Sequence, residues 1–247
     1  MKTIVVLILC MTGAVFCFGQ DSQKPVQSNV NEVKVTPPKF TGRINSISLL
    51  KNEKSESIDD YLAKKITYPE ADRKNFIQGS EVVRFKVTPV GELSDFTVIN
   101  SVSPNMDEEV IRILQTTNGM WMTGYNNDQP VEMESEVSVA FKITGMKFSP
   151  EFKELGTKYF IKGGNSFLTE NNPKKALKYY DKAARYVPND VNLLLFRGMA
   201  KYQTGNADGA IQDWERIKTL GDSVSEIYLS KVLELKGYDE LANILNK

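Results

Sequence analysis

The chain has 247 residues, of which 41% are hydrophobic and 25% charged, a composition typical of one large or two ordinary globular domains. Lys plus Arg and Asp plus Glu both number 31, so charge gives no reason to expect nucleic acid or an anionic membrane surface as a partner. Histidine is absent and the two cysteines stand at positions 10 and 17, which excludes Ser-His-Asp, Cys-His and the usual zinc sites from the rest of the chain. We therefore expect no enzyme, no metal and no cofactor, and we name no catalytic residue.

The N-terminus has the pattern of a secretory signal peptide. Lys2 precedes an apolar run from Ile4 to Phe18, and polar residues follow Gly19 directly. This pattern predicts a signal peptide over residues 1–19. A retained membrane anchor is the alternative, but the run is shorter than the roughly 20 apolar residues that a spanning helix needs.

Residues 20–45 are polar and weakly patterned. They include Pro37 and Pro38, which favour extended, polyproline-like chain. The sequence thus predicts a flexible linker over 20–45, followed by a folded domain over 46–145.

The folded domain begins with a predicted helix from Ile58, capped by Ser57, in which apolar residues repeat at helical spacing. Tyr68-Pro69 ends this helix, and a helical turn follows over 70–74. Residues 81–87 and 93–100 alternate as two strands, and Gly91 suits the turn between them.

A second predicted helix follows Asn105, which we expect to cap it; acidic residues at 107–109 complement its dipole. Residues 131–143 then form one long predicted strand, with Glu132, Glu134 and Glu136 together on one face. The order helix, strand, strand, helix, strand predicts an α+β domain with an antiparallel sheet, one face under helices and the other in solvent.

Residues 150–247 read as helices with an internal period of 34 residues. The pairs at this spacing are Gly164 and Gly198, Ala176 and Ala210, and Tyr180 and Trp214. Over about residues 155–222, this pattern of small and large side chains resembles that of tetratricopeptide (TPR) repeats. The resemblance implies an all-α repeat domain with repeats at 157–190 and 191–224 and degenerate capping helices after them.

Residues 58–143 resemble the C-terminal domain of TonB, the energy transducer of the Gram-negative envelope. The resemblance rests on these segments, in order: Tyr68-Pro69-Glu70-Ala71, Gly79, Gly91-Glu92-Leu93, Asn100-Ser101, Asp107 to Leu114, Trp121, Gly124, Gln129-Pro130-Val131 and Val137 to Phe141. It implies a domain that binds an extended peptide, added as a strand beside its last strand by β-augmentation.

Two sets of binding residues follow from the two resemblances. The TonB-like edge would comprise Thr67, Tyr68, Pro69, Val137, Val139 and Phe141. The TPR groove would comprise Lys158, Ile161, Asn165, Leu168, Asn192, Leu195, Met199 and Tyr202. The glutamates at 132, 134 and 136 fit either a basic partner or a solvated face.

The function expected is that of a periplasmic adaptor, in which the TonB-like edge binds an envelope peptide and the TPR groove a second protein. Its partners would be envelope proteins, TonB-dependent outer-membrane receptors among them, and no nucleic acid. Two alternatives stay open: an energy transducer anchored in the inner membrane, and an assembly scaffold that forms a homodimer through its edge strand. A transducer of this family carries a histidine in its anchor and a long Pro-rich spacer, and this chain has neither.

Overall fold

A computed structural model of the protein describes residues 34–42, 56–143 and 150–234. By their contacts, the residues from Lys34 onward form one compact unit. The predicted signal peptide (1–19) and the first part of the predicted linker lie outside the described residues.

The centre of the α/β domain is a three-stranded antiparallel sheet of β3 (Gly79–Val87), β4 (Leu93–Asn100) and β8 (Met133–Phe141), in the order β4-β3-β8. The β3–β8 register runs without interruption from Gly79 opposite Phe141 to Val87 opposite Met133. Alternation of apolar and polar residues fixes this register, because a slip by one residue would turn every core side chain to the other face. The hairpin predicted for 81–100 is confirmed.

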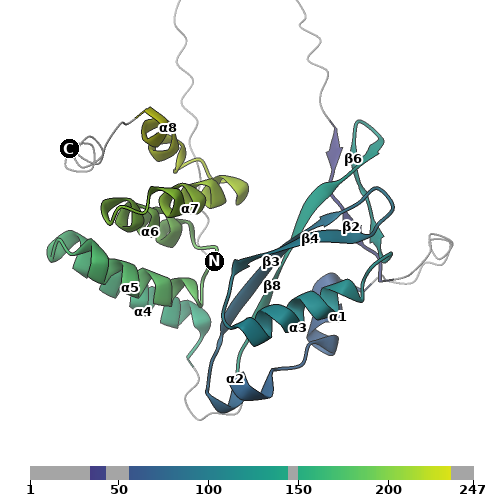
Figure 1. Ribbon diagram of the computed structural model, residues 1–247, viewed down its shortest axis with the longest axis horizontal. Helices are drawn as coiled ribbons and strands as arrows, with labels where there is room; N and C mark the ends of the chain where they lie inside the picture. The colour runs from purple at the N-terminus through teal and green to yellow at the C-terminus, as the bar shows by residue number, and fades with distance from the viewer. Residues whose placement is uncertain (1–33, 43–55, 144–149, 235–247) are drawn as a thin grey trace, which may run out of the picture. The chain divides into compact units, whose positions relative to one another are not determined.

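Three helices accompany the sheet: α1 (Ile58–Lys65), α2 (Glu70–Lys74) and α3 (Pro104–Gln115), of which α3 contacts β3 and β4 (Figure 1). The Ser57 side chain caps α1 by accepting from the Asp60 N–H, as predicted. The cap of α3 differs from the prediction. Ser103, not Asn105, accepts from the Met106 N–H, because Pro104 with its fixed φ starts the helix earlier than expected.

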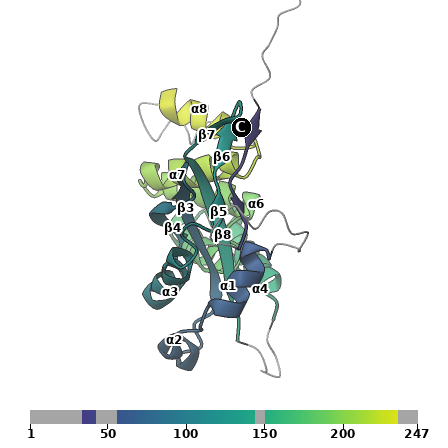
Figure 2. The same ribbon diagram turned by 90° about the vertical axis from the view of Figure 1, so that its right-hand side faces the viewer.

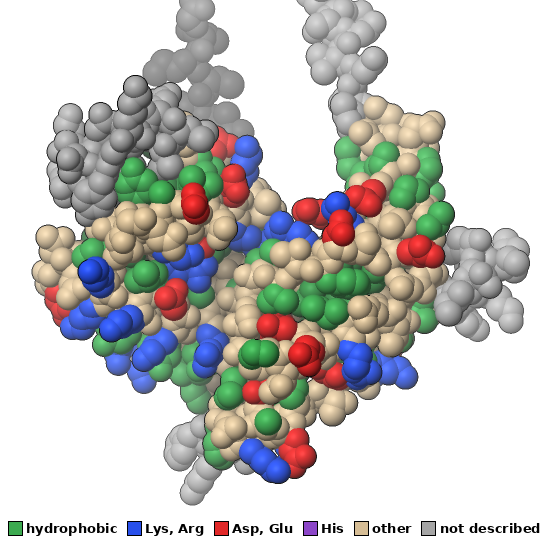
Figure 3. Space-filling view, viewed as in Figure 1, with side chains coloured by type: hydrophobic (Ala, Val, Ile, Leu, Met, Phe, Trp, Pro, Cys, Tyr) green, Lys and Arg blue, Asp and Glu red, His purple; other side chains and the backbone are tan. Residues whose placement is uncertain are grey.

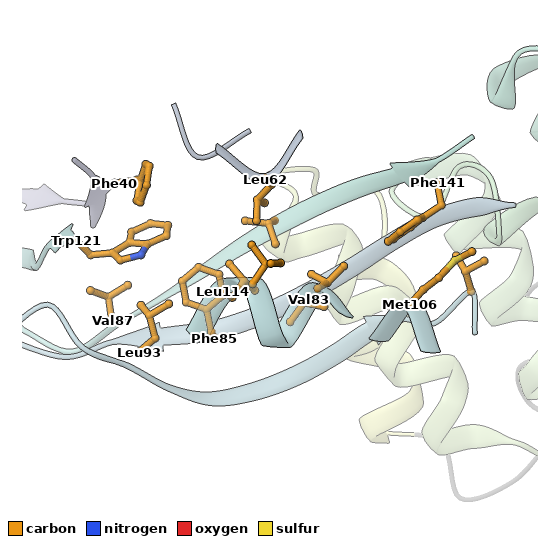
Figure 4. Packing of buried hydrophobic residues seen from close by; sticks show 14 residues of the cluster. Phe40, Leu62, Val83, Phe85, Val87, Leu93, Met106, Leu114, Trp121 and Phe141 are labelled. Atoms are coloured by element: carbon orange, nitrogen blue, oxygen red, sulfur yellow. The ribbon is translucent and has the colours of Figure 1, made fainter. Parts of the chain in front are cut away.

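The core of the domain lies between the sheet and these helices. Figure 4 shows Phe40 and Trp121 at one end of this cluster and Met106 and Phe141 at the other. Trp121 is only 7% exposed and packs edge-on against Phe85 at 5.2 Å between ring centroids, so it is a core residue of the domain. Its indole N–H donates to Thr117 Oγ1 at 2.9 Å, so burial leaves no polar atom of the ring unpaired.

The chain before the domain takes part in the fold. β1 (Val35–Thr36) pairs with β6 (Gly124–Asn126), and β2 (Lys39–Phe40) pairs with β5 (Trp121–Met122); Figure 2 shows β6 with its hairpin partner β7 (Gln129–Val131). Phe40 is 6% exposed and packs on Trp121 and Tyr61. Residues 34–42, predicted as part of the linker, therefore include two short strands, because one buried aromatic ring and two backbone ladders hold them.

The long strand predicted over 131–143 is divided in two. β7 ends at Val131 and β8 begins at Met133, with Glu132 between them. The pairing partner changes at this point, from Gly124 opposite Val131 to Val87 opposite Met133. The break therefore marks where one ladder ends and the next begins.

The C-terminal region is helical, as predicted. It comprises α4 (Phe152–Gly164), the π-helix η2 (Asn165–Thr169), α5 (Pro173–Ala184), α6 (Val191–Gln203), α7 (Ala207–Thr219) and α8 (Glu226–Glu234). Each α-helix contacts the next one along the chain from α4 to α8. Asn172, Asp190 and Asn206 cap α5, α6 and α7 through their side chains.

The glycine that matters in α4 is Gly163 and not Gly164. A Cβ on Gly163 would overlap the Tyr180 ring and one on Gly198 would overlap the Trp214 indole, whereas nothing lies within 4 Å of a Cβ on Gly164. The equivalent glycines are therefore 35 residues apart rather than 34. The π-helix that follows α4 accommodates one extra residue in a helical segment, which accounts for the difference.

The second face of the sheet is partly covered, at the start of β3. Val82 is fully buried there, and the Ser80 N–H donates to the Arg185 carbonyl at 2.8 Å. Ser80 Oγ donates to the Tyr186 carbonyl at 3.0 Å. The expectation of a wet outer face is thus wrong for the start of β3, where residues 185 and 186 contact it, and holds for Ser138 and Ala140 of β8, which are exposed.

Candidate functional site: the free edge of the last strand

β8 is a terminal strand of its sheet. It pairs with β3 on one side, and no described strand pairs with its other side. A nine-residue strand in this position presents a row of N–H and C=O groups that a further extended chain can bind.

The hydrogen bond of Ser80 shows which residues of β8 face outward. Ser80 lies opposite Ala140, and its N–H donates away from β8, to Arg185. In an antiparallel ladder this makes Ser80 and Ala140 a non-hydrogen-bonded pair, and such pairs alternate with bonded ones. The backbone groups of Ala140 and Ser138 therefore point to the free edge, while those of Val139 bond to β3.

The predicted edge residues of β8 pack in the core of the domain and do not lie along the free edge of the strand. Val137 is 4% and Phe141 3% exposed, and both belong to the core; Val139 packs partly buried against the same cluster. Their side chains point into the domain, so an added strand would bind the backbone of β8 instead of these side chains.

The predicted segment 67–69 lies at the C-terminal end of β8. The Tyr68 ring meets Phe141 edge-on at 5.5 Å between centroids, and its hydroxyl donates to the Ile77 carbonyl at 2.5 Å. Burial, with the Asp72 carboxylate as a second cause, raises the pKa of Tyr68, so the hydroxyl stays protonated and keeps this bond. The Thr67 N–H donates to Glu109 at 2.7 Å. The structure thus brings 67–69 and β8 together, as the resemblance implied.

The three glutamates beside the edge have partners within the chain. Glu132 pairs with Lys86 at 3.1 Å and Glu134 with Arg84 at 3.6 Å. Glu136 accepts from both terminal nitrogens of Arg216, which is 9% exposed and also donates to Asn189. The basic partner that the sequence left open is therefore, for Glu136, a residue of α7.

The predicted groove residues divide into two groups. Ile161 is 56% and Leu168 70% exposed, and Lys158 and Asn165 beside them are exposed as well. These four side chains form an accessible surface on α4 and η2, which we call the α4 surface. Asn192 on α6 is also exposed.

The other three predicted groove residues are in the core. Leu195, Met199 and Tyr202 are 8%, 6% and 8% exposed and pack in one cluster with Trp214. Tyr202 stacks on the Trp214 indole at 6.3 Å, and the indole N–H donates to the Leu195 carbonyl. This face of α6 is therefore occupied by α7, and it does not line an open groove.

Sequence reasoning missed the junction between Glu136 and Arg216. Each lies on a regular element where a charged residue needs no explanation, and 80 residues separate them. No local signal pairs them. Only a comparison of related sequences, in which the two positions change together, could have pointed to the contact.

Comparison with known proteins identifies one domain. Residues 64–143 match the family model for the Gram-negative bacterial TonB protein C-terminal domain. The match begins in the last turn of α1 and ends just beyond β8, and it confirms the TonB resemblance over this range. Comparisons with curated proteins and with solved structures gave no match. In the part of the chain that the structure describes, no helix is both long and apolar enough to span a membrane.

Proposed function

Because residues 64–143 carry a TonB C-terminal domain, we propose that this chain is an adaptor protein of the Gram-negative envelope. The free edge of β8 captures an extended peptide of an envelope protein by β-augmentation, and TonB-dependent outer-membrane receptors are the expected source of that peptide. The C-terminal helices act as a TPR-like array that holds a second protein. The chain works by binding, not by catalysis, in the periplasm, after removal of residues 1–19.

The observation that carries this proposal is the outward orientation of the backbone at Ser138 and Ala140. Binding through these groups needs no particular side chain on β8. This agrees with the burial of Val137 and Phe141, whose side chains a peptide cannot reach.

The α4 surface supports a separate site for the second protein. Ile161 and Leu168 are large apolar side chains that are more than half exposed. In this exposed position their burial contributes little to the stability of the fold, and exposed apolar side chains that lie together mark interaction surfaces. Their lysine and amide neighbours suit a protein partner that offers apolar and acidic groups together.

Photo-crosslinking in intact envelopes tests both halves of the proposal. A photoreactive residue replaces Thr67, beside the end of β8, or Leu168, on the α4 surface; the exposed Gln115 on α3 is the control position. We expect one set of adducts from position 67, a different set from position 168, and neither set from position 115.

The variant Ala140→Pro sharpens the test. Proline removes an N–H that faces the free edge and leaves the β3–β8 ladder intact, because proline is tolerated on the outer side of an edge strand. It should abolish the adducts from position 67 and keep those from position 168. Undiminished adducts at position 67, in a variant whose circular dichroism is unchanged, would refute β-augmentation at β8.

Two rival functions are separated by simple measurements. An anchored transducer is favoured by the TonB domain itself and requires an uncleaved N-terminus, so a mature chain that starts near Gln20 excludes it. A dimerising scaffold would use the same free edge of β8. Sedimentation at increasing concentration distinguishes it, since a scaffold dimerises and an adaptor stays monomeric.

A further inference from the structure

The opposite edge of the sheet borders a cleft of about 460 Å³. One wall is β4, over residues 97–100, and the other is formed by α6 and α7. In Figure 3, blue Lys and Arg side chains lie along the junction of the helices with the sheet. Like β8, β4 pairs with β3 alone among the described strands.

The cleft follows the backbone of β4. Thr97, Val98, Ile99 and Asn100 are consecutive, and all four line it. The β3–β4 register shifts between Val82 and Val83, which leaves one extra residue on β4 at this point, and such a bulge at the edge of the sheet lets consecutive residues line one cleft.

The hydrogen-bond alternation of β3 shows which backbone groups of β4 are involved. The β3–β8 register is unbroken, so Arg84, like Ser80, directs its backbone groups away from β8 and toward β4. Arg84 lies opposite Thr97, and the two form a bonded pair. The backbone N–H and C=O of Val98, the next residue, therefore point into the cleft.

The walls of the cleft carry more positive than negative side chains. Arg84, Arg197, Lys201 and Arg216 line it together with two acids, Asp213 and Glu215, and further acids beside the lining pair with Arg84, Arg197 and Arg216: Glu134, Glu136 and Asp181. The Asp213 carboxylate forms ion pairs with two of these cations, with Arg197 Nη2 at 2.6 Å and with Lys201 Nζ at 2.9 Å. Burial lowers the pKa of Lys201 and the neighbouring Arg197 lowers it further, against the raising effect of Asp213 and Asp181.

Arg84 is the cation best placed to take an added anion. Its ion pairs with Glu134 and Glu136 are both 3.6 Å long, beyond the roughly 2.7–2.9 Å of a charge-assisted hydrogen bond. A carboxylate brought into the cleft would give its guanidinium closer partners.

We propose that this cleft is a second peptide site, in which an extended acidic segment of a partner protein adds to β4 as a strand and sets its carboxylates against the basic side chains of Arg84, α6 and α7. The four residues of β4 span about 13 Å, room for a short stretch of extended chain. The site is separate from the one proposed at β8, since the two strands are opposite edges of one sheet.

Hydrogen–deuterium exchange on the full chain tests the site with a defined probe. The probe is a capped hexapeptide of alternating glutamate and valine, and the same peptide with lysine for glutamate is its control. We expect the acidic peptide to slow exchange over residues 93–100 and the basic one to leave it unchanged. Protection confined to residues 133–141 would overturn the proposal while supporting the β8 site, so the two proposals fail independently.

Substitution of the exposed Gln212, which lines the cleft on α7, tests the charge argument. Gln212→Lys should tighten binding of the acidic peptide several-fold and Gln212→Glu should weaken it several-fold, both without loss of folding. Gln115→Glu, on α3 and outside the cleft, is the matched control and should change nothing. Equal affinities of all these variants for the acidic peptide would overturn the proposal. Protection of residues 93–100 that grows with protein concentration in the absence of peptide would also overturn it, because the occupant of the cleft would then be a second copy of this chain.

Discussion

Arg216 of α7 holds Glu136 of β8 with both of its terminal nitrogens, Nη1 donating to Oε2 at 2.6 Å and Nη2 to Oε1. Nη2 also donates to Asn189 Oδ1 at 2.9 Å. The contact joins the strand proposed to bind a peptide to the helices proposed to bind a second protein.

Arg216→Met should separate the two parts of the chain. The substitution leaves the Glu136 carboxylate, which is 24% exposed, with only the longer ion pair to Arg84, and for such a partly buried group this costs roughly 1–3 kcal/mol of the free energy of unfolding. The chain has two tryptophans, Trp121 in the α/β domain and Trp214 in the helices, so urea unfolding followed with each one, the other replaced by Phe, reports on each part. With Arg216 in place, we expect Trp121 and Trp214 to report unfolding at the same urea concentration. With Arg216→Met, we expect the two tryptophans to report unfolding at two different urea concentrations.

The double substitution Glu136→Gln with Arg216→Met should recover most of the lost stability, since no charge is then left unpaired. Lys142→Met is a control, because its partner Glu151 is largely exposed and an exposed pair contributes less than about 1 kcal/mol. Equal effects of Arg216→Met and Lys142→Met would contradict the role given to the Arg216 pair.

Glu81 should make the stability of the α/β domain depend on pH. Its side chain is fully buried, and burial, followed by the neighbouring Asp107 carboxyl, raises its pKa to about 8, against the lowering effect of the Val102 N–H, from which Glu81 accepts a hydrogen bond. The native state thus holds this proton more tightly than the unfolded chain does. The stabilisation is fully present below a pH of about 4.5 and is lost as the pH rises toward about 8.

The measurement is the free energy of unfolding of Glu81→Gln minus that of the unsubstituted protein, by urea titration at several pH values. This difference should rise in favour of the glutamine variant between about pH 5 and pH 8, by roughly 1.4 kcal/mol per pH unit at most. Taking the difference removes the contribution of other titrating groups. A difference that does not change with pH would show that Glu81 is ionised throughout.

Gly163→Ala and Gly164→Ala should have opposite effects although the residues are adjacent. The added methyl at 163 would overlap the Tyr180 ring, and such overpacking costs about 1–3 kcal/mol. At 164 it would meet nothing and would remove the entropic cost of a helical glycine, a gain of about 0.5–1 kcal/mol. Thermal unfolding of the two variants side by side checks this. If Gly164→Ala were the damaging change, the packing of α4 on Tyr180 through Gly163 would be wrong.

Phe40→Ala should release the N-terminal strands from the domain. The ring contacts Tyr61 and Trp121, and loss of a buried phenylalanine costs about 3 kcal/mol or more. The emission of Trp121 should shift to the red as water reaches it, and amide exchange over residues 34–42 should accelerate. Val35→Ala, on a side chain that is 57% exposed, is the control and should change stability by less than about 0.5 kcal/mol.

The elements of the α/β domain are predictable because each has a local cause. Ser57 caps α1, Pro69 stops the chain from continuing that helix, and the alternation of Val83, Phe85 and Val87 sets the core face of β3. The predicted cap of α3 lies two residues late because Ser103 and Asn105 are both good caps, and the choice depends on the proline between them.

The sequence predicts that the C-terminal region is helical, but it predicts only some of the contacts between these helices. The spacing of Ala176 from Ala210 and of Tyr180 from Trp214 fits the burial of all four residues. Which face of α6 stays open is not predictable, because Leu195, Met199 and Tyr202 repeat at helical spacing whether they line a groove or pack on α7. The identity of the region as TPR repeats stays a prediction.

By itself the sequence determined the main helices, the β3–β4 hairpin, the core face of β3 and β8 and the TonB-like domain, since these depend on neighbours within a few residues and on patterns that repeat. Only the tertiary structure decided that Phe40 draws its strand into the domain, that the helical region covers the start of β3 on the outer face of the sheet, and that Glu136 meets Arg216. These contacts join residues tens of positions apart in the chain. A charged residue on a helix or an apolar one in a linker carries no local mark of its partner, so the partner becomes known only when the chain is folded.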